Sequence, residues 1–301
     1  GAKYFNKESR IFGWYGIPKK ENNLKKIPGI VLLHGGLGTA FAPWVEYWNK
    51  LGYAAIAIDI FGGLPANDGN YCSNEHPKLH QYSGANYDDK FNHLDEEVEN
   101  QWCYHAISAA ITARSFLASL NEVDKDNIGL TGISWGGYIA SLTAGFCPNF
   151  KFIMPVYACG GKDFVNLVVD KNDTNVKEKF FNLWNPNNNL SRVTTPMLWV
   201  NGANDPFFDV YNWNITSGLG ANSYRLLKPT MVHSQKEGEK SLELATFANF
   251  IINNKKYFTT KGDNLSSNDP LKVKEEQVIG IIVFPIPRVG YPSVWLYELL
   301  N

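Results

Sequence analysis

The sequence predicts an α/β fold in which helices flank a mostly parallel central sheet. Short apolar runs alternate with segments whose apolar residues recur at helical spacing, a pattern typical of parallel sheets. Of the 301 residues, 44% are hydrophobic and 19% are charged, so the chain can bury a large core. A glycine-rich turn at residues 132–137 joins one predicted strand directly to a helix.

The predicted elements follow in order from an edge-like strand near the N-terminus. The later apolar runs have the length of buried strands. Strands are predicted over residues 10–15, 30–33, 54–58, 128–130, 152–156, 197–200 and 224–227. Apolar residues at helical spacing predict helices over residues 102–120, 138–144 and 242–252.

Two long stretches interrupt this alternation. Residues 61–100 are polar and rich in glycine, asparagine and aspartate, and their acidic residues within 88–99 are expected to form a solvated face and a helix-start charge pattern. Residues 160–190 carry apolar residues that could anchor them, namely Phe180, Phe181 and Trp184. Both stretches follow strand ends at the edge of the sheet where ligands bind, so we expect lid-like insertions there. The predicted catalytic domain spans residues 1–253, and residues 254–301 form a C-terminal extension of uncertain structure.

The run Gly132-Ile133-Ser134-Trp135-Gly136 fits the pattern G-x-S-x-G between a strand and a helix. Such a turn is so tight that side chains at the glycine positions would collide with the strand or the helix. It lifts the serine hydroxyl above the sheet edge. We therefore predict that Ser134 is a nucleophile, the alternative being a glycine- and serine-rich turn without a chemical role.

A serine hydroxyl needs a base to remove its proton, and the base needs a carboxylate to orient it. His233 is the one histidine C-terminal to Ser134, and it lies in a loop after the predicted strand 224–227. Asp205 follows the strand 197–200 in a turn rich in asparagine, glycine and proline. The order serine, acid, histidine fits a known hydrolase arrangement. Asp209 is the rival acid, and Asp205 is preferred because it is nearer the strand end.

Attack on an ester creates an oxyanion that needs hydrogen-bond donors. The backbone N–H of Trp135, directly after the nucleophile, is the first predicted donor. The second is expected from the glycine-rich loop after the strand 30–33, with Gly36 preferred and Leu37 next. His34 in this loop is predicted to brace it rather than to act as a base. A plain turn between strand and helix is the alternative.

The chain is rich in tryptophan, with nine residues of this type. Four of them could line an aromatic pocket that stacks on sugar or aryl groups. These candidates are Trp44, Trp102, Trp184 and Trp213. Packing in the core is the alternative for each one.

No metal site and no organic cofactor are predicted. His76 and His80 are four residues apart, but Pro77 disrupts a helix between them and no Glu matches a metal-binding pattern. The formal net charge of −1 provides no basic surplus for nucleic acid or an anionic membrane. No apolar run approaches the roughly 20 residues of a membrane helix. The oligomeric state stays open, and both a cytoplasmic and a secreted location fit the sequence. Free or half-buried thiols are predicted for the four cysteines, Cys72, Cys103, Cys147 and Cys159, the alternative being one disulfide.

Four segments together carry a resemblance to a known family: HGGLGTAF, GISWGGY, PMLWVNGAND and MVHS. They resemble the α/β-hydrolase superfamily and, within it, the acetyl-xylan-esterase and prolyl-oligopeptidase-like branch with its dienelactone-hydrolase relatives. The resemblance covers about residues 10–253. It implies the α/β-hydrolase fold, a triad of Ser134, Asp205 and His233, no metal or organic cofactor, and an acyl-enzyme intermediate.

Three functions compete at this stage. The first is a serine carboxylic ester hydrolase acting on a small-molecule or carbohydrate ester, such as an acetyl or feruloyl ester of plant carbohydrate. The second is a serine peptidase of the prolyl-oligopeptidase kind, which usually adds a large propeller domain. The third is a hydrolase fold used only for binding. An intact Ser134, Asp205 and His233 favour an enzyme, because a binding module has no need for all three.

Overall fold

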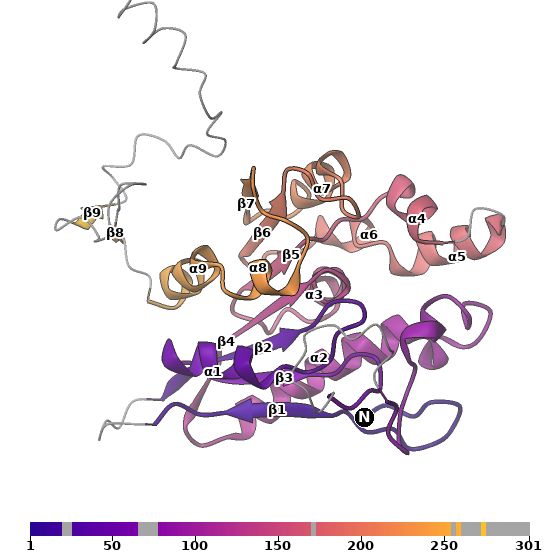
Figure 1. The fold of residues 1–301 in the computed structure, drawn as a ribbon, viewed down its shortest axis with the longest axis horizontal. Coiled ribbons are helices and arrows are strands. Elements are labelled where there is room, and N and C mark those ends of the chain that lie inside the picture. Colours follow the sequence, from indigo (N-terminus) through magenta and orange to yellow (C-terminus); the bar gives the residue numbers. More distant parts are fainter. Residues whose placement is uncertain (20–25, 66–77, 170–172, 254–256, 260–271, 275–301) are drawn as a thin grey trace, which may run out of the picture.

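A seven-stranded sheet runs through the centre of the computed structural model, which describes residues 1–19, 26–65, 78–169, 173–253, 257–259 and 272–274 (Figure 1). The strands lie in the order β1-β3-β2-β4-β5-β6-β7. β1 pairs antiparallel with β3, and every other neighbouring pair in this sheet is parallel. The strands are β1 (Gly13–Gly16), β2 (Ile27–Leu33), β3 (Ala54–Ile58), β4 (Val123–Ile133), β5 (Ile153–Val156), β6 (Met197–Gly202) and β7 (Ser223–Lys228). The predicted fold class is confirmed, and the predicted edge strand pairs antiparallel.

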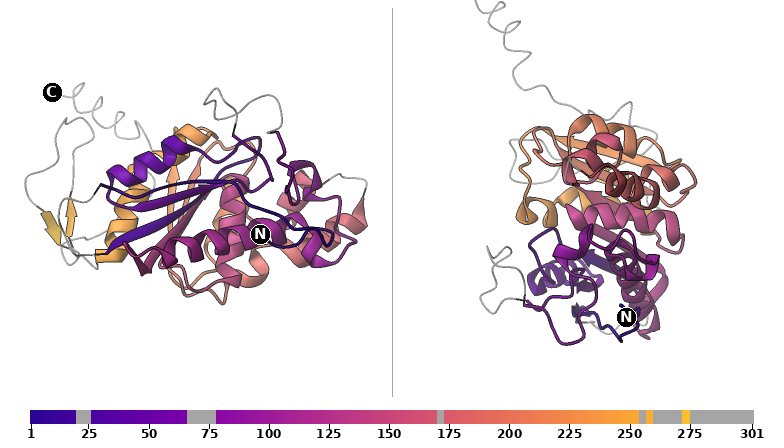
Figure 2. Two further views of the ribbon diagram at one scale, coloured as in Figure 1. Left: turned by 90° about the horizontal axis from the view of Figure 1, so that it is seen from below. Right: turned by 90° about the vertical axis from the view of Figure 1, so that its right-hand side faces the viewer.

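Helices cover both faces of the sheet (Figure 2). α2 and α3 pack against each other and against the central strands. α1 packs on β1, β2 and β3. The segment between α1 and β3 contacts α9, because the Tyr53 hydroxyl donates to Asn249 Oδ1 at 2.9 Å. The helices are α1 (Ala42–Lys50), α2 (Trp102–Ser119), α3 (Trp135–Phe146), α4 (Lys162–Val168), α5 (Thr174–Trp184), α6 (Asn187–Leu190), α7 (Val210–Ser217), α8 (Gln235–Glu239) and α9 (Leu242–Asn253). None of the described helices has the length and apolar character needed to cross a membrane.

Several boundaries differ from the sequence prediction, among them the starts of β1, β2, β4 and α3. β4 begins at Val123, five residues before the predicted start, because its polar first half still pairs with β2 through Ile27. α3 begins at Trp135 rather than at Tyr138, so the helix starts directly after the serine. The short helices α1 and α7 were not predicted. Each has only two turns or so, too few for a clear apolar period.

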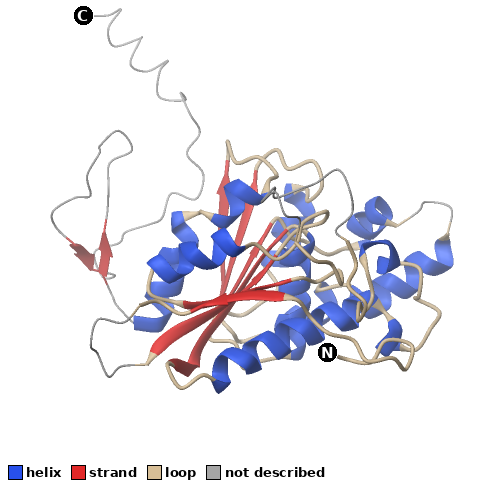
Figure 3. Ribbon diagram, turned by 60° about the horizontal axis from the view of Figure 1, so that its bottom comes forward, coloured by secondary structure: helices blue, strands red, loops and turns tan. Residues whose placement is uncertain are grey.

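The register of the parallel strands aligns their carboxyl ends. Leu33 of β2 lies opposite Gly132 of β4, and Ile133 of β4 lies opposite Val156 of β5. Val156 in turn lies opposite Val200 of β6. The residues that follow these positions therefore emerge at one edge of the sheet, which is drawn in red in Figure 3.

The two insertions pack against each other at this edge. Phe91 of the first and Phe180 of the second have ring centroids 5.0 Å apart. The indole N–H of Trp184 donates to Gln101 Oε1 at 2.7 Å, and Lys179 forms an ion pair with Asp95. Described structure in the first insertion includes the 3₁₀ helices η1 (Tyr87–Lys90) and η2 (Val98–Asn100).

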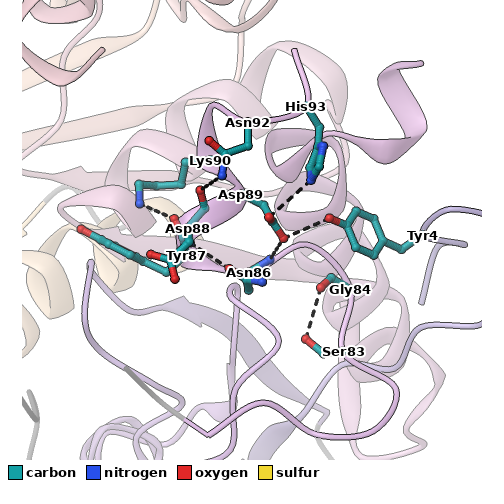
Figure 4. Close-up of polar contacts among 10 residues, drawn as sticks. All are labelled: Tyr4, Ser83, Gly84, Asn86, Tyr87, Asp88, Asp89, Lys90, Asn92 and His93. Atoms are coloured by element: carbon teal, nitrogen blue, oxygen red, sulfur yellow. Dashed lines mark hydrogen bonds and ion pairs between the residues drawn. The ribbon is translucent and has the colours of Figure 1, made fainter. Parts of the chain in front are cut away.

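The first insertion is organised around Asp89 (Figure 4). Its carboxylate accepts the Tyr4 hydroxyl at 3.0 Å and the Asn86 backbone N–H at 3.1 Å, and it lies 3.3 Å from His93 Nε2. Asp89 lies in the first turn of η1, as the predicted helix-start charge pattern expects, but its side chain is only 15% exposed, so it does not belong to a solvated face. This carboxylate caps η1 and ties it to the N-terminal segment.

The C-terminal extension is described at two short strands, β8 (Tyr257–Thr259) and β9 (Lys272–Lys274), which pair antiparallel. The described cysteines, Cys103, Cys147 and Cys159, are buried free thiols. Cys72 and His76 lie outside the described residues.

Candidate active site

Ser134 occupies the tight turn between β4 and α3. Its backbone has φ +57° and ψ −120°, a left-handed conformation that a residue with a side chain rarely adopts. A Cβ at Gly132 would collide with the backbone carbonyl of Gly136, and a Cβ at Gly136 would collide with the carbonyl of Leu33. The glycines thus allow the close approach of helix and strands, and this approach holds Ser134 at the sheet edge.

Three side chains from three separate loops form a continuous hydrogen-bonded series. His233 Nε2 lies 3.0 Å from Ser134 Oγ, and His233 Nδ1 lies 2.6 Å from Asp205 Oδ2. The Asp205 side chain is fully buried, and the His233 side chain is 16% exposed. The imidazole therefore bridges a buried carboxylate and a hydroxyl at the sheet edge, in the arrangement that activates a serine.

The turn after β6 fixes the orientation of the Asp205 carboxylate. Asp205 Oδ1 accepts the backbone N–H groups of Phe207 and Phe208, each at 2.8 Å, which leaves Oδ2 for the imidazole. The rival acid, Asp209, faces elsewhere. It caps α7, where Oδ1 accepts the backbone N–H of Asn212 at 2.9 Å and Oδ2 accepts the Asn212 side chain at 2.8 Å.

Aromatic rings surround the His233 imidazole. The ring centroid of Tyr157 lies 4.6 Å away, that of Phe207 4.9 Å and that of Phe208 5.8 Å. The Phe208 ring is nearly parallel to the imidazole, at an interplanar angle of 10°. Sequence reasoning missed these three residues. The signal for Phe207 and Phe208 is that they directly follow Asp205-Pro206, so the turn that holds this carboxylate also places two rings beside the His233 imidazole.

The glycine-rich loop after β2 lies on the other side of Ser134. A Cβ added at Gly35 would be 3.2 Å from the Cβ of Ser134, and one at Gly36 would be 2.8 Å from Cδ1 of Trp135. Leu37 has φ +59° and is 39% exposed. The Trp135 N–H belongs to the first turn of α3, where backbone N–H groups have no partner within the helix. The three predicted oxyanion donors thus lie on two segments beside the serine.

The His34 side chain braces the glycine-rich loop after β2. Its Nδ1 donates to the Gly35 carbonyl at 2.7 Å, and its Nε2 accepts the Ile60 backbone N–H at 3.1 Å. Both ring nitrogens are therefore engaged with backbone, and the side chain is buried. Asp59 stabilises the same region, since its Oδ1 accepts the backbone N–H groups of Phe61 and Gly63.

The first insertion contributes a wall to the site through Tyr87. A Cβ added at Gly36 would lie 3.1 Å from Cε2 of Tyr87. Burial raises the pKa of Tyr87, and a hydrogen bond with the Trp135 side chain opposes part of that rise. Lys90 Nζ lies 3.0 Å from the Tyr87 ring centroid and donates to the Tyr87 carbonyl (Figure 4). Burial lowers the pKa of Lys90 to about 8, although Asp88 and Asp89 act in the opposite direction.

The four candidate pocket tryptophans lie in the core. Trp44 and Trp102 are 0% exposed, Trp213 is 3% and Trp184 is 4% exposed. Trp102 stacks on Phe61 at 5.0 Å and donates its indole N–H to the Ile60 carbonyl. The prediction that these residues stack on a substrate is therefore wrong. Their large apolar surfaces gain more from burial than an open rim would provide.

In the described part of the chain, no group of three or more His, Cys, Asp and Glu side chains could hold a metal ion. The nearest described candidate, His80, accepts the backbone N–H of Tyr82 through Nδ1 at 3.2 Å.

Comparisons with known proteins agree with this architecture. An acetyl xylan esterase from Paenibacillus sp. R4 has a similar structure, with a TM-score of 0.62, 21% identity and coverage of 81% of this chain and 79% of that chain. Est1E from Butyrivibrio proteoclasticus, solved with ferulic acid, has a TM-score of 0.55, 16% identity and coverage of 81% and 94%. An acylaminoacyl peptidase from Pyrococcus horikoshii has a TM-score of 0.58, 18% identity and coverage of 81% and 41%.

These likenesses share the α/β-hydrolase fold at low sequence identity. No curated protein matches the sequence. The sequence profile of the acetyl xylan esterase (AXE1) family, however, matches residues 4–194. This span covers more than half of the chain and includes the glycine-rich loop, the first insertion and the turn at Ser134. The chain therefore belongs to the acetyl xylan esterase family of carboxylic ester hydrolases.

Proposed function

We propose that this esterase acts by a serine mechanism, with Ser134 as nucleophile, His233 as base and Asp205 as the acid that orients the base. The observation that carries the proposal is the unbroken series from Ser134 Oγ through the imidazole to Asp205, with distances of 3.0 and 2.6 Å. Both distances allow proton transfer and orientation without rearrangement.

In the first half of the reaction, Ser134 Oγ attacks the ester carbonyl carbon while its proton passes to His233 Nε2. Asp205 stabilises the resulting imidazolium through Nδ1. The carbonyl oxygen becomes an oxyanion, which accepts hydrogen bonds from the Trp135 N–H and from the loop at Gly36 or Leu37. Collapse of this intermediate breaks the bond to the alcohol, which leaves with the proton from His233.

In the second half, water attacks the acyl group on Ser134. His233 takes a proton from the water and then returns it to Ser134 Oγ as the acid departs. The sum of the two halves is ester plus water to acid plus alcohol. Every proton transfer runs through His233, so the same geometry serves both halves.

The acyl group we propose is small, with acetyl the first choice. The Trp135 and Tyr87 side chains crowd the loop at Gly36, where even one added carbon would lie 2.8 Å from Trp135 Cδ1. This crowding favours a short acyl chain beside the oxyanion donors. Family membership supports the same choice, while the likeness to Est1E keeps a feruloyl ester as the second candidate.

The alcohol group must leave beside His233, because His233 gives it the proton. The surface next to the imidazole is apolar and exposed: Phe207 is 57% exposed and Val232 is 62% exposed. An exposed aromatic ring stacks well on the apolar face of a sugar. We therefore propose an acetylated carbohydrate, such as an acetylated xylo-oligosaccharide, as the substrate class.

The test compares initial rates on p-nitrophenyl acetate, butyrate and ferulate, on acetylated xylo-oligosaccharides and on peptide nitroanilides. Ser134→Ala should lower ester turnover by about 10⁴-fold or more and abolish labelling by a fluorophosphonate probe. Ser141→Ala is the matched control, because that serine lies on α3 and donates to the Tyr138 carbonyl, away from His233. Retained turnover in Ser134→Ala would refute the mechanism.

A peptidase is the second candidate, favoured by the structural likeness to the acylaminoacyl peptidase. Cleavage of peptide nitroanilides without ester cleavage would reverse the order of the two. No turnover of any substrate, with no probe labelling, would favour a binding protein instead.

A further inference from the structure

Tyr157 lies at the end of β5, directly beside the candidate site. Its side chain is 0% exposed, and its backbone N–H donates to the Val200 carbonyl at 2.9 Å. Its φ of +52° is in the left-handed region, which a residue with a bulky side chain rarely occupies. Such backbone strain persists only where the surrounding structure holds the residue in place, and strained residues cluster at active sites.

The Tyr157 hydroxyl contacts the backbone on both sides of His233. It donates to the Val232 carbonyl at 2.6 Å, and it accepts the backbone N–H of Ser234. One oxygen thus spans the residue before and the residue after the histidine. The Tyr157 ring also packs against the imidazole, with centroids 4.6 Å apart and an interplanar angle of 40°.

We propose that Tyr157 is a positioning residue, whose hydroxyl fixes the backbone around His233 so that the imidazole reaches Asp205 and Ser134 together. The inference rests on the proposed serine mechanism and adds a residue outside its triad.

The loop needs such a tether because the residue directly before the histidine is exposed to solvent. Val232 is 62% exposed, and it lies between β7 and the short helix α8. On the C-terminal side of His233, the Ser234 hydroxyl accepts the Glu237 N–H at 3.2 Å and caps α8. The imidazole must satisfy two distances at once, 2.6 Å to Asp205 and 3.0 Å to Ser134. A misplacement of about 1 Å at such a site can lower the rate about 10²-fold.

The hydroxyl acts here as a neutral hydrogen-bonding group. Burial raises the pKa of Tyr157 far above its ordinary value, the hydrogen bond from Ser234 opposes this, and the charges of Asp205 and Glu237 add to the rise. The phenol therefore keeps its proton throughout the pH range in which His233 works. It orients the loop without taking part in the proton transfer.

The test is Tyr157→Phe, which removes the hydroxyl and keeps the ring. We expect kcat for p-nitrophenyl acetate to fall about 10- to 100-fold with KM changed less than about twofold. The loss should be the same factor from pH 6 to 9, and fluorophosphonate labelling of Ser134 should slow in parallel. Hydrogen exchange at the Ser234 amide should be faster, because that N–H loses its acceptor.

The matched control is Tyr53→Phe. Tyr53 is also buried and also donates from its hydroxyl, to Asn249 Oδ1 at 2.9 Å. It directly precedes β3, at the opposite end of the parallel sheet from Ser134. Tyr53→Phe should lower the melting temperature without changing kcat.

A kcat within twofold of wild type in Tyr157→Phe would overturn the inference, as would an equal loss in Tyr53→Phe. A loss confined to the alkaline limb of the pH profile would also overturn it, because the hydroxyl would then be a proton donor. If the wild type hydrolyses no ester, the proposed function fails, and Ser234 exchange still decides the inference. Unchanged exchange in Tyr157→Phe would show that the hydroxyl tethers nothing.

Discussion

Replacing Asp205 with asparagine tests the acid of the proposed triad with almost no change in shape. The new amide has two orientations. In one, its oxygen keeps both hydrogen bonds from Phe207 and Phe208, now made at 2.8 Å, and its NH₂ group faces His233 Nδ1. In the other, the NH₂ group faces two backbone donors, and both bonds are lost at a cost of about 2–6 kcal/mol.

The first orientation should therefore dominate, and it forces the wrong tautomer on the histidine. Nδ1 must accept from the amide, so the ring proton moves to Nε2, which lies 3.0 Å from Ser134 Oγ. A protonated Nε2 cannot take the serine proton. We expect kcat to fall by about 10⁴-fold, or about 5 kcal/mol of transition-state stabilisation.

The assay is steady-state hydrolysis of p-nitrophenyl acetate, with Asp209→Asn as the control. Asparagine caps a helix about as well as aspartate, so the control should keep α7 intact and its kcat within twofold of wild type. Asp205→Asn with a kcat within tenfold of wild type would refute the role given to this carboxylate. An equal loss in Asp209→Asn would move the acid to that residue.

Three further predictions follow from other parts of the structure. Gly132→Ala should lower the melting temperature by several degrees and remove activity, because the new Cβ meets the Gly136 backbone, whereas Gly220→Ala, where the nearest atom is 3.8 Å away, should do neither. Phe207→Ala should raise KM for acetylated xylo-oligosaccharides about 2- to 10-fold with little change in kcat, since its backbone N–H still binds Asp205; an unchanged KM would exclude the ring from substrate binding. Lys90 binds its proton less tightly in the folded protein, with a pKa of about 8, than in the unfolded chain, near 10.5. The unfolded state therefore holds more protons between these values, and the stability of wild type relative to Lys90→Met should rise as pH increases from 8 to 10.5 in urea unfolding.

The central sheet could be predicted from the sequence because its signals are local. Each buried strand is a short apolar run, and the turn at Ser134 is specified by Gly132 and Gly136, whose missing side chains are a steric requirement. Asp205 and His233 could be selected for a similar reason, since each closely follows a predicted strand. The parallel register then brings these strand ends to one edge.

The walls of the site could not be predicted, because they depend on contacts between residues distant in sequence. Tyr87 of η1 lies beside Gly36, and Asp89 of the same short helix is tied to Tyr4, 85 residues away. The prediction that the four tryptophans line a substrate pocket was wrong for the same reason. The sequence alone does not show whether the fold buries an aromatic residue. Trp184 is buried, and its indole N–H donates to Gln101, which lies 83 residues away in the sequence.

The turn at residues 205–208 connects the Asp205 carboxylate to the His233 imidazole. The Phe208 N–H binds Asp205, its ring stacks on the His233 imidazole at 5.8 Å, and its carbonyl accepts the Asn201 side chain at 2.7 Å. Asn201 is buried at the end of β6. Phe208 therefore connects this strand to both Asp205 and His233. Movement of the turn would therefore displace the carboxylate and the imidazole in concert. With Tyr157 holding the backbone of His233 from the end of β5, two adjacent strands fix the same ring from different sides, while the strained turn after β4 holds Ser134.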